Sequence, residues 1–465
     1  MKVRKDVYGL PKGDTTLEWY EKAVALMKTR DTSDPTSWAY LGAIHGISPN
    51  PQWNYYWSQY APFPPKTETD GFWERCQHQS WYFLPWHRMY LAYFEQIVAQ
   101  AIVELGGPDD WALPFWNYCD TENPLALDIP EAFTTPADSS NNLWMPNRHN
   151  QVDRSSVTLK ALKKKIYTTS PQETGYGGPE TKFNHSGGSN GALESYPHNH
   201  VHVDIGGAMG NPDTAGLDPI FWLHHANIDR LWQVWLNEGE GRSNPDEKNW
   251  LNFKFNFHDK DKQAVTLTPK EVEDTRKVLS GYTYEGVAPS APGAVTKAAK
   301  GAVAGRKMAV MPLEIVDATQ KAQALTAQPS RVSLSLSAKK ASRKSAKTVS
   351  KQEGGKRMML RFENIKGTGL VPVQSVYLEI PGEDGIPQAY LAGSLALFGL
   401  ERASTADEHH SGSGLSEHLD ITELVNSLQD SGKFNADKLD VLIQSNRPMP
   451  NESSVSVGKI SLYSE

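Results

Sequence analysis

The sequence is poor in cysteine and has no long hydrophobic run. Cys76 and Cys119 are the only cysteines among 465 residues, too few for a disulfide framework and consistent with a reducing compartment. No segment approaches the roughly 20 apolar residues of a membrane-spanning helix, so we expect no membrane partner. The N-terminal residues MKVRKDVYGLPKGD lack the apolar core and the cleavage site of a secretory signal peptide, which predicts a cytoplasmic protein.

A strong excess of one charge is also missing. The chain has 47 basic and 54 acidic residues and a net charge of -7, which identifies no partner. The stretch 338–357 is strongly basic, but it contains no aromatic side chain that could stack on a base and no nucleic-acid-binding motif. We interpret this stretch as a solvated loop and expect no nucleic-acid partner, with binding to another kind of partner as the alternative.

Tryptophan, tyrosine and helical periodicity are concentrated in residues 1–285. Apolar residues at helical spacing predict four helices joined by long loops, at residues 16–30, 37–45, 86–105 and 217–237. Helices of this kind predict a four-helix bundle whose interior could hold a functional site.

The composition changes beyond residue 285. The Pro/Gly/Ala-rich residues 286–306 predict a linker. Residues 307–465 contain short β-branched or alternating runs separated by turn residues, which predict an antiparallel β-sandwich-like domain with the basic stretch 338–357 as a long loop. The expected fold class is therefore multidomain α + β, with a mainly α domain followed by a β-rich domain.

Histidine is the residue whose grouping says most about chemistry, and the chain has 14 of them. In CQHQSWYFLPWHRMYLAYFE, His78 and His87 are followed by Glu95, which lies two helical turns after His87 and could orient a ligand or a basic neighbour. In ESYPHNHVH, His198 and His202 are four residues apart. On a helix, this spacing places both imidazoles on one face, as in many metal sites.

A third group lies in DPIFWLHHANIDRLW, where His224 and His225 are adjacent and cannot both face one point. Asp229, one turn after His225, is placed to fix a ligating imidazole. No glutamate lies between His198 and His202, as it would in a zinc protease, and the Glu-x-x-His helices of carboxylate-bridged di-iron proteins are absent. A neutral, all-imidazole ligand set suits copper, which can cycle between two oxidation states.

Two longer motifs identify the family that the sequence resembles. The pattern H-x4-F-x-x-W-H-R-x6-E is present as His78, Phe83, Trp86, His87, Arg88 and Glu95. The pattern D-P-x-F-x3-H-x3-D is present as Asp218, Pro219, Phe221, His225 and Asp229. The sequence thus resembles the type 3 dicopper proteins, which include tyrosinases, polyphenol oxidases, catechol oxidases and haemocyanins. The resemblance covers about residues 15–285, and together with the β-rich domain it is similar to the long bacterial form.

The resemblance implies two copper ions, dioxygen as a co-substrate and three histidine ligands for each ion. Copper A would be bound by His45, His78 and His87, and copper B by His198, His202 and His225. The residues expected behind these ligands are Glu95, Phe221, His224 and Asp229, and His200 is expected at the rim.

The cysteine near the first motif, Cys76, also resembles a cysteine of the family. Cys76 precedes His78 by two residues and resembles the cysteine that forms a thioether crosslink to this histidine in some family members, the alternative being an unmodified thiol. Cys119 lies in the apolar stretch LPFWNYCD, and we expect it to be a buried structural thiol.

Proton transfer separates the possible activities within the family. A phenol has a pKa of about 10, so ortho-hydroxylation near neutral pH needs help with removal of its proton. Family members that hydroxylate monophenols are similar in using a water held by a glutamate and an asparagine, and Glu194 and Asn199 match these positions. Residues 206–219 contain no bulky aromatic side chain that would cover copper B, which favours an oxidase over a dioxygen carrier.

We therefore expect a tyrosinase-type enzyme that ortho-hydroxylates monophenols and oxidises o-diphenols to o-quinones, with a small phenol and dioxygen as its partners. A homo-oligomer is compatible with the sequence. The β-rich domain resembles the shielding domain of latent polyphenol oxidases and predicts partial latency. The alternatives are a catechol oxidase or aminophenol oxidase without monophenolase activity, and a haemocyanin-like dioxygen carrier.

Overall fold

Two compact units make up the described part of the chain. The computed structural model describes residues 1–169, 174–288, 313–336, 357–382, 386–406, 412–433 and 438–464. Of these, the first unit contains 1–169, 174–186 and 190–288, and the second contains 187–189 and all residues from 313 onward. Most of the predicted linker 286–306 and of the predicted basic loop 338–357 lies outside the described residues.

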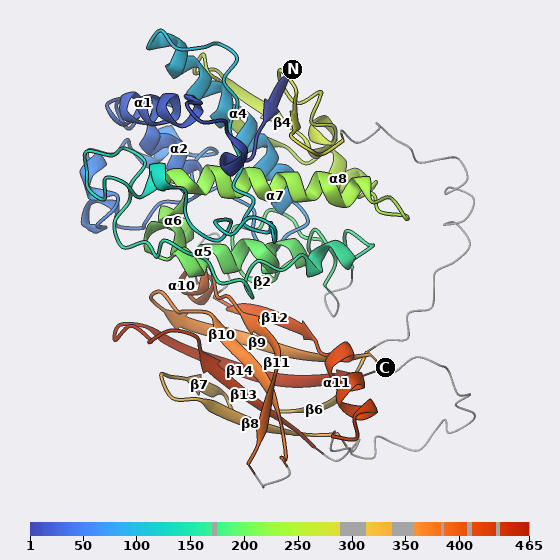
Figure 1. The fold of residues 1–465 in the computed structure, drawn as a ribbon. Coiled ribbons are helices and arrows are strands. Elements are labelled where there is room, and N and C mark those ends of the chain that lie inside the picture. The colour runs from blue at the N-terminus through green and yellow to red at the C-terminus, as the bar shows by residue number, and fades with distance from the viewer. Residues whose placement is uncertain are drawn as a thin grey trace. The chain divides into compact units, whose positions relative to one another are not determined.

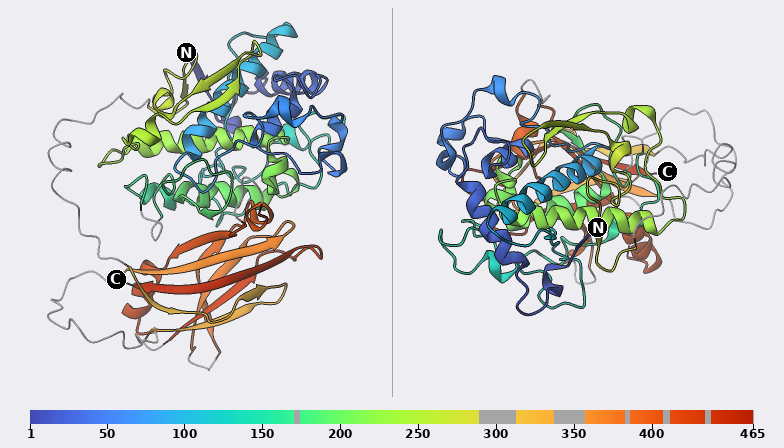
Figure 2. Two further views of the ribbon diagram at one scale, coloured as in Figure 1. Left: turned by 180° about the vertical axis from the view of Figure 1, so that it is seen from behind. Right: turned by 90° about the horizontal axis from the view of Figure 1, so that it is seen from above.

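Helices form the frame of the first unit (Figure 1). Its longer helices are α1 (Thr16–Lys28), α2 (Trp38–His45), α4 (Phe83–Glu104) and α7 (Pro219–Asn237). Its shorter helices are α3 (Lys66–Thr69), α5 (His200–Ile205), α6 (Pro212–Ala215) and α8 (Lys248–Leu251). α4 packs against both α1 and α7, and the view from above in Figure 2 shows α4 and α7 side by side. The four predicted helices are therefore confirmed, with ends shifted by a few residues.

Local sequence explains where the two central helices begin. The Asp218 side chain accepts a hydrogen bond from the Ile220 amide and Pro219 occupies the first turn, so α7 starts with a capped N-terminus. α4 begins at Phe83, before the predicted start, and includes Pro85 in its first turn. Proline is tolerated there because first-turn amides have no partner within the helix.

Two small sheets complete the first unit. β1 (Lys2–Arg4) pairs in parallel with β5 (Tyr282–Tyr284), so the start of the chain lies against the last strand of this unit. β3 (Phe255–His258) and β4 (Ala264–Leu267) form an antiparallel pair. The pairing of β1 with β5 places Arg4 in the interior, where it is fully buried.

The segment before α5 is irregular. Residues Glu194–Asn199 form a π-helical turn in which Tyr196 has non-helical dihedral angles, and regular α5 begins at His200. The structure therefore places His198 in this turn and His202 on α5, so the two histidines do not share one regular helix. π-Helical turns of this kind occur frequently at functional sites.

The second unit is a sandwich of two sheets. One sheet has the order β11-β10-β13-β8, and the other has the order β2-β12-β9-β14-β6, with β7 also paired to β14. The strands are β2 (Gly188–Ser189), β6 (Glu314–Ala318), β7 (Gln323–Leu325), β8 (Ser330–Ser335), β9 (Met358–Thr368), β10 (Gln374–Ile380), β11 (Gln388–Leu395), β12 (Leu415–Asp420), β13 (Lys438–Ser445) and β14 (Ser454–Ser464). Two helices, α10 (Leu400–Ser404) and α11 (Thr422–Asp430), accompany them.

Alternating burial explains why these strands form a sandwich. Along β10 every second residue is buried, from Gln374 to Ile380. Buried residues of the two sheets, among them Val376 and Val441 from one sheet and Phe362 and Val457 from the other, form one hydrophobic core. The described strand pairs of this second unit are antiparallel except for β12 with β2, so the predicted antiparallel β-sandwich is confirmed.

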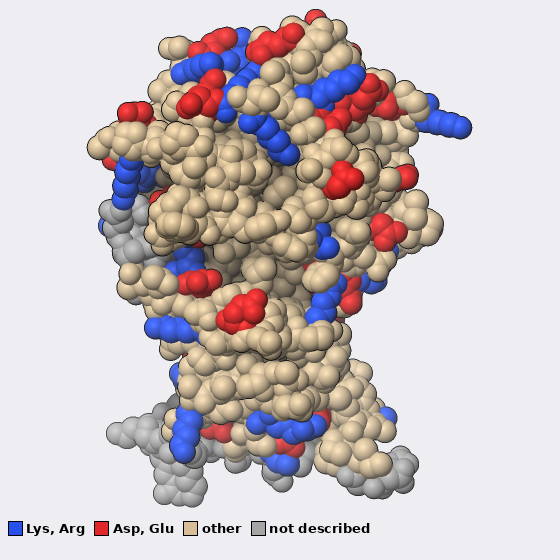
Figure 3. Space-filling view, turned by 90° about the vertical axis from the view of Figure 1, so that its left-hand side faces the viewer, with Lys and Arg blue, Asp and Glu red and all other residues tan. Residues whose placement is uncertain are grey.

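The surface carries mixed charge. On the face shown in Figure 3, basic and acidic side chains are interspersed rather than gathered into one patch of a single sign. Among the helices that the structure describes, none combines the length and the apolar composition needed to cross a membrane.

Candidate metal centre

Six predicted ligand histidines come together in the interior of the first unit. His45 is the last residue of α2, His87 lies in the second turn of α4, and His225 lies on α7. The other three are His78, just before α4, and His198 and His202 around the start of α5. Each of the six side chains is at most 2% exposed.

Cluster A consists of His45, His78 and His87. Its ring centroids are 5.2 Å apart for His45 and His78, 5.7 Å for His45 and His87, and 5.6 Å for His78 and His87. The three imidazoles therefore lie together, although they come from three different segments of the chain. By ligand-atom distance, the side chains within 4.8 Å of one another here are His45, Cys76 and His78.

Cluster B consists of His198, His202 and His225. The Nε2 atom of His225 lies 3.3 Å from Nε2 of His198 and 3.4 Å from Nε2 of His202. Three ring nitrogens of the same type thus converge on one small volume. This is the arrangement that a metal ion with three imidazole ligands requires.

The two clusters face one another. The rings of His87 and His225 are stacked at a centroid distance of 4.4 Å and an interplanar angle of 14°. His78 and His198 are 5.9 Å apart, again centroid to centroid. Two metal ions bound to these clusters would therefore be close neighbours.

Hydrogen bonds to oxygen hold several of these rings. The Nδ1 atoms of His45, His87 and His202 each lie 2.8 Å from a backbone carbonyl, namely those of Pro212, Phe83 and Met209. A carbonyl oxygen only accepts, so Nδ1 must donate and Nε2 then carries the lone pair. This is the tautomer in which a histidine binds a metal through Nε2 while a partner behind it fixes the ring.

Electrostatics also favour neutral imidazoles. Burial lowers the pKa values of His87, His198, His202 and His225 well below the usual 6.5, and neighbouring histidines lower them further. Nε2 of His87 is buried without a hydrogen-bond partner in the described part of the chain. Such an atom costs about 1–3 kcal/mol unless something binds it. A copper ion fits this donor set, since it accepts neutral nitrogen ligands and would occupy that lone pair.

Cys76 lies beside cluster A, as predicted, but it has two histidine neighbours. Its Sγ atom is 3.4 Å from Nδ1 of His78 and 2.9 Å from Nδ1 of His185. No local pattern in the sequence marks His185, because its place beside Cys76 depends on a contact between residues 109 positions apart. Cys119 is buried, as expected of a structural thiol, and burial raises its pKa to about 12.

Glu194 and Asn199 are both buried beside the clusters. Oε1 of Glu194 accepts a hydrogen bond of 2.7 Å from the backbone amide of Gln79, the neighbour of His78. Oδ1 of Asn199 lies 2.8 Å from Nδ1 of His198, and the Asn199 Nδ2 atom has no hydrogen-bond partner among the described residues. The two side chains therefore contact the segments that carry His78 and His198.

Asp229 and Glu95 do not hold ligand rings, contrary to the expectation for Asp229. Asp229 binds Nε of Arg88 through Oδ1 at 2.6 Å, and its Oδ2 accepts hydrogen bonds of 2.6 Å from the hydroxyls of Tyr282 and Tyr284. Nδ1 of His225 has no partner in the described residues, so the carboxylate one turn away does not fix this ring. Arg88 of α4 and Arg4 of β1 compete successfully for the carboxylate because both are buried cations that need a counter-charge.

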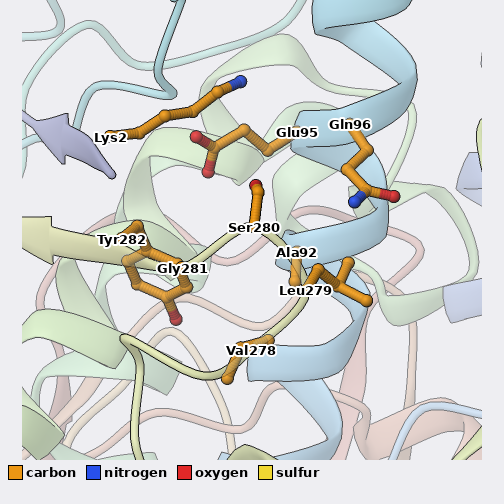
Figure 4. Close-up of a pocket in the computed structure, with 9 residues that line it drawn as sticks. All are labelled: Lys2, Ala92, Glu95, Gln96, Val278, Leu279, Ser280, Gly281 and Tyr282. Atoms are coloured by element: carbon orange, nitrogen blue, oxygen red, sulfur yellow. The ribbon is translucent and has the colours of Figure 1, made fainter.

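Glu95 contacts a basic neighbour, which is one of the two roles that its spacing allowed. Its Oε2 atom accepts from Nε of Arg4 at 2.8 Å, and the Arg4 guanidinium also binds the Tyr284 hydroxyl. Figure 4 shows Glu95 in a small pocket between α4 and β5, with the Lys2 side chain beside it. Burial alone would raise the pKa of Asp229, but Arg88 and Arg4 hold it below its usual value. This network of buried charges joins β1 and β5 to α4 and α7.

Aromatic side chains pack around the two clusters. The Phe221 ring lies 4.2 Å from that of His225 and 5.0 Å from that of His45, so it packs against both clusters. His200 is fully buried and stacks on Tyr196 at 3.8 Å, so the expected place at the rim is wrong. His224 is also buried and lies beside cluster B.

Known families match successive parts of this chain. Residues 35–238 match the family described as the common central domain of tyrosinase, and residues 244–292 match the polyphenol oxidase middle domain. Residues 312–465 match a domain of unknown function (DUF7868). The matched central domain contains all six histidines of clusters A and B.

Comparison with individual proteins extends the match to the full length. The chain is 42% identical over 482 residues to "Tyrosinase HcTyr1" of Hahella sp. (strain CCB-MM4), which covers 100% of both chains. It is 30% identical to (+)-larreatricin hydroxylase of Larrea tridentata over 59% of its own length and 47% of that relative, so it spans about half of this plant protein. A structure of latent apple tyrosinase has the same fold, with a TM-score of 0.60 and 20% identity over 100% of this chain and 97% of that one.

These findings agree with the geometry of the two histidine clusters. A full-length relative at 42% identity and a matching central domain assign the copper chemistry to the family as a whole, with two copper ions and dioxygen as the co-substrate. The chain belongs to the tyrosinase and polyphenol oxidase family of type 3 copper enzymes.

Proposed function

We propose that cluster A binds copper A, that cluster B binds copper B, and that the enzyme both ortho-hydroxylates monophenols and oxidises o-diphenols to o-quinones. The observation that carries the assignment of the ligands is the pair of buried, facing clusters in which Nδ1 atoms are held by oxygens. When bound, the copper pair supplies the site for dioxygen and the electrons for its reduction. The role of the chain is to hold six neutral imidazoles in place.

Monophenol hydroxylation depends on a proton acceptor beside the clusters. Glu194 and Asn199 contact the segments carrying His78 and His198, whose rings are 5.9 Å apart. The Asn199 amide has an Nδ2 atom available to hold a water, and the carboxylate of Glu194 can polarise that water so that it accepts the phenolic proton. A catechol needs this assistance less, since it already carries both oxygens. The name of the Hahella relative supports the same activity.

We also propose that the β-sandwich unit limits access to the site, so that the enzyme is partly latent. Support comes from the fold, because the full chain shares its architecture with an apple tyrosinase described as latent. The sandwich has its own hydrophobic core, so it can act as a separate shielding body.

The experiment is oxygen uptake by the copper-loaded full chain, first with tyramine and then with catechol. Uptake with both substrates supports the proposal, and uptake with catechol alone means that Glu194 and Asn199 do not suffice for hydroxylation. Reversible oxygen binding without sustained uptake would favour a dioxygen carrier. An o-aminophenol, assayed in parallel, tests the aminophenol oxidase alternative.

Latency is tested with a protease site inserted between residues 295 and 300. We expect cleavage to raise the turnover per bound copper pair, because it releases the β-sandwich unit from its connection. Equal turnover before and after complete cleavage and separation of the fragments would contradict latency while leaving the oxidase assignment intact.

A further inference from the structure

A fourth buried imidazole lies within reach of cluster B. His224 is fully buried on α7, and its ring centroid is 5.3 Å from that of His198, 4.8 Å from His202 and 5.0 Å from His225. The three rings of cluster B are themselves separated by 4.6 to 5.6 Å. By distance alone, His224 is therefore indistinguishable from a member of the cluster.

The hydrogen bonds of His224 follow the pattern expected of a metal-binding histidine. Nδ1 of His224 lies 3.0 Å from the hydroxyl of the buried Tyr118, and Nε2 has no partner in the described part of the chain. The same pattern holds for His87, whose Nδ1 is held by an oxygen and whose Nε2 has no partner among those residues. When the Tyr118 hydroxyl accepts from Nδ1, Nε2 of His224 carries a lone pair that can bind a metal.

The four rings are close enough together to bind one common metal ion. Each of His198, His202, His224 and His225 offers a ligand nitrogen, and these atoms all lie within 4.8 Å of one another. Two nitrogens bound to one ion at about 2.0–2.1 Å can be at most about 4.2 Å apart, so even a pair at the 4.8 Å limit must move together by about 0.6 Å when the ion binds. Neighbouring positions on a helix predict that His224 and His225 diverge, but the structure brings a nitrogen of each into the same volume.

We propose that His224 is an auxiliary copper ligand that binds the ion at cluster B while cluster A is still empty. A lone copper(II) ion favours a tetragonal set of four donors, and His224 completes such a set with His198, His202 and His225. Once the second ion is bound, three imidazoles serve each copper and His224 remains behind His198 and His202. This inference rests on the proposed assignment of copper to cluster B.

The test uses the full chain with cluster A disabled by His45→Gln, so that added copper(II) can bind only at cluster B. The number of coordinated imidazoles is counted from the electron spin echo modulation of their remote nitrogens. Copper affinity is measured by competition with a chelator. We expect four imidazoles in this parent, three after His224→Gln or His224→Phe, and a loss of affinity of about 10–100-fold.

The matched control is His200→Gln. His200 is equally buried and its Nδ1 lies 2.8 Å from the Ser195 carbonyl, but it is outside the four-imidazole group. This control should keep four imidazoles and the affinity of the parent. Tyr118→Phe adds a third variant, which keeps the imidazole but removes its anchor, and we expect it to weaken the affinity less than His224→Gln does.

Two outcomes separate this inference from the proposed function. If the unmodified chain binds no copper, the proposed function itself fails. If the unmodified chain binds two copper ions while the parent shows three imidazoles and His224→Gln leaves its affinity unchanged, only the role of His224 is overturned. Circular dichroism of each copper-free variant shows whether it folds, and a variant that does not is replaced in the comparison by Tyr118→Phe.

Discussion

The two histidine clusters are held by different parts of the protein. In cluster A, Nδ1 of His45 and of His87 lie against backbone carbonyls. In cluster B, His202 is held in this way, but His198 is held by the side chain of its neighbour Asn199. Cluster B also has the extra imidazole of His224 beside it.

This difference matters for how the two sites can change. A ring that is anchored by a carbonyl moves only if the main chain moves, whereas a ring anchored by a side chain responds to one substitution. Cluster A is therefore the fixed half of the centre and cluster B the adjustable half. The following predictions test this contrast, beginning with the largest expected effect.

Loss of one ligand should abolish activity in either cluster. His87→Gln and His225→Gln each leave one ion of the two-copper state with two of its three assigned imidazoles, so we expect one bound copper in place of two and oxygen uptake at background. Copper is measured by atomic absorption and activity by oxygen uptake. His258→Gln, at a half-buried histidine outside both clusters, should keep two copper ions, and two ions in either ligand variant would contradict the assignment.

Removing the charge of Asp229 should lower the free energy of unfolding of the unit that carries both clusters. Asp229→Asn leaves the fully buried Arg88 and Arg4 without this counter-charge, and breaking a buried ion pair in this way costs about 3–5 kcal/mol. Urea unfolding of the copper-free chain measures this cost. Lys22→Ala, which breaks an exposed pair with Glu18, should cost only about 0.3–0.5 kcal/mol, and similar losses for the two variants would refute the network's role.

Changing the anchor of His198 should affect cluster B alone. Asn199→Ala removes the oxygen that holds Nδ1, and loss of such a partner typically costs 10–100-fold, or about 1.4–2.8 kcal/mol, in metal affinity. We expect copper B to be lost first on titration with a chelator, together with a larger fall in tyramine turnover than in catechol turnover. Asn199→Asp keeps an acceptor and should retain more copper B, and equal release of both ions from Asn199→Ala would contradict the contrast.

Acid should destabilise the copper-free chain through histidines beside cluster B. Burial lowers the pKa of His200 to about 4 and that of His224 to about 3, from 6.5. Below about pH 6.5 these histidines bind protons in the unfolded chain but not in the folded chain. The free energy of unfolding therefore falls by about 1.4 kcal/mol per pH unit for each such histidine. Their contribution is therefore complete above about pH 6.5 and is lost as the pH falls toward the folded values.

The His200→Gln variant isolates one histidine's share of this slope. We expect its unfolding free energy to fall less steeply between about pH 6.5 and pH 4 than that of the unmodified chain, by about 1.4 kcal/mol per pH unit. Denaturant unfolding at a series of pH values measures the slope. An unchanged slope would mean that His200 is protonated in the folded chain.

Much of the fold could be predicted because its signals are local. The spacing of apolar residues predicts α1, α2, α4 and α7, and alternation along strands such as β10 predicts the sandwich. The two motifs around His78 and His225 predict which histidines gather, and the structure places all of them in the two clusters.

Contacts between residues that are far apart in the sequence could not be predicted. The sequence places Asp229 one turn from His225, but only the folded chain brings Arg88, Arg4 and the two tyrosines to compete for the carboxylate. The approach of His185 to Cys76 and the convergence of His224 on cluster B likewise depend on tertiary packing. No pattern in a single sequence encodes such partners.

The pairing of β1 with β5 has a consequence for the order of events during synthesis. Arg4 precedes its hydrogen-bond partner Tyr284 by 280 positions in the chain. Every histidine of clusters A and B leaves the ribosome in this interval, before the strand that completes the buried charge network exists. The buried charge network that joins β1 and β5 to α4 and α7 can therefore close only after all six imidazoles have been synthesised.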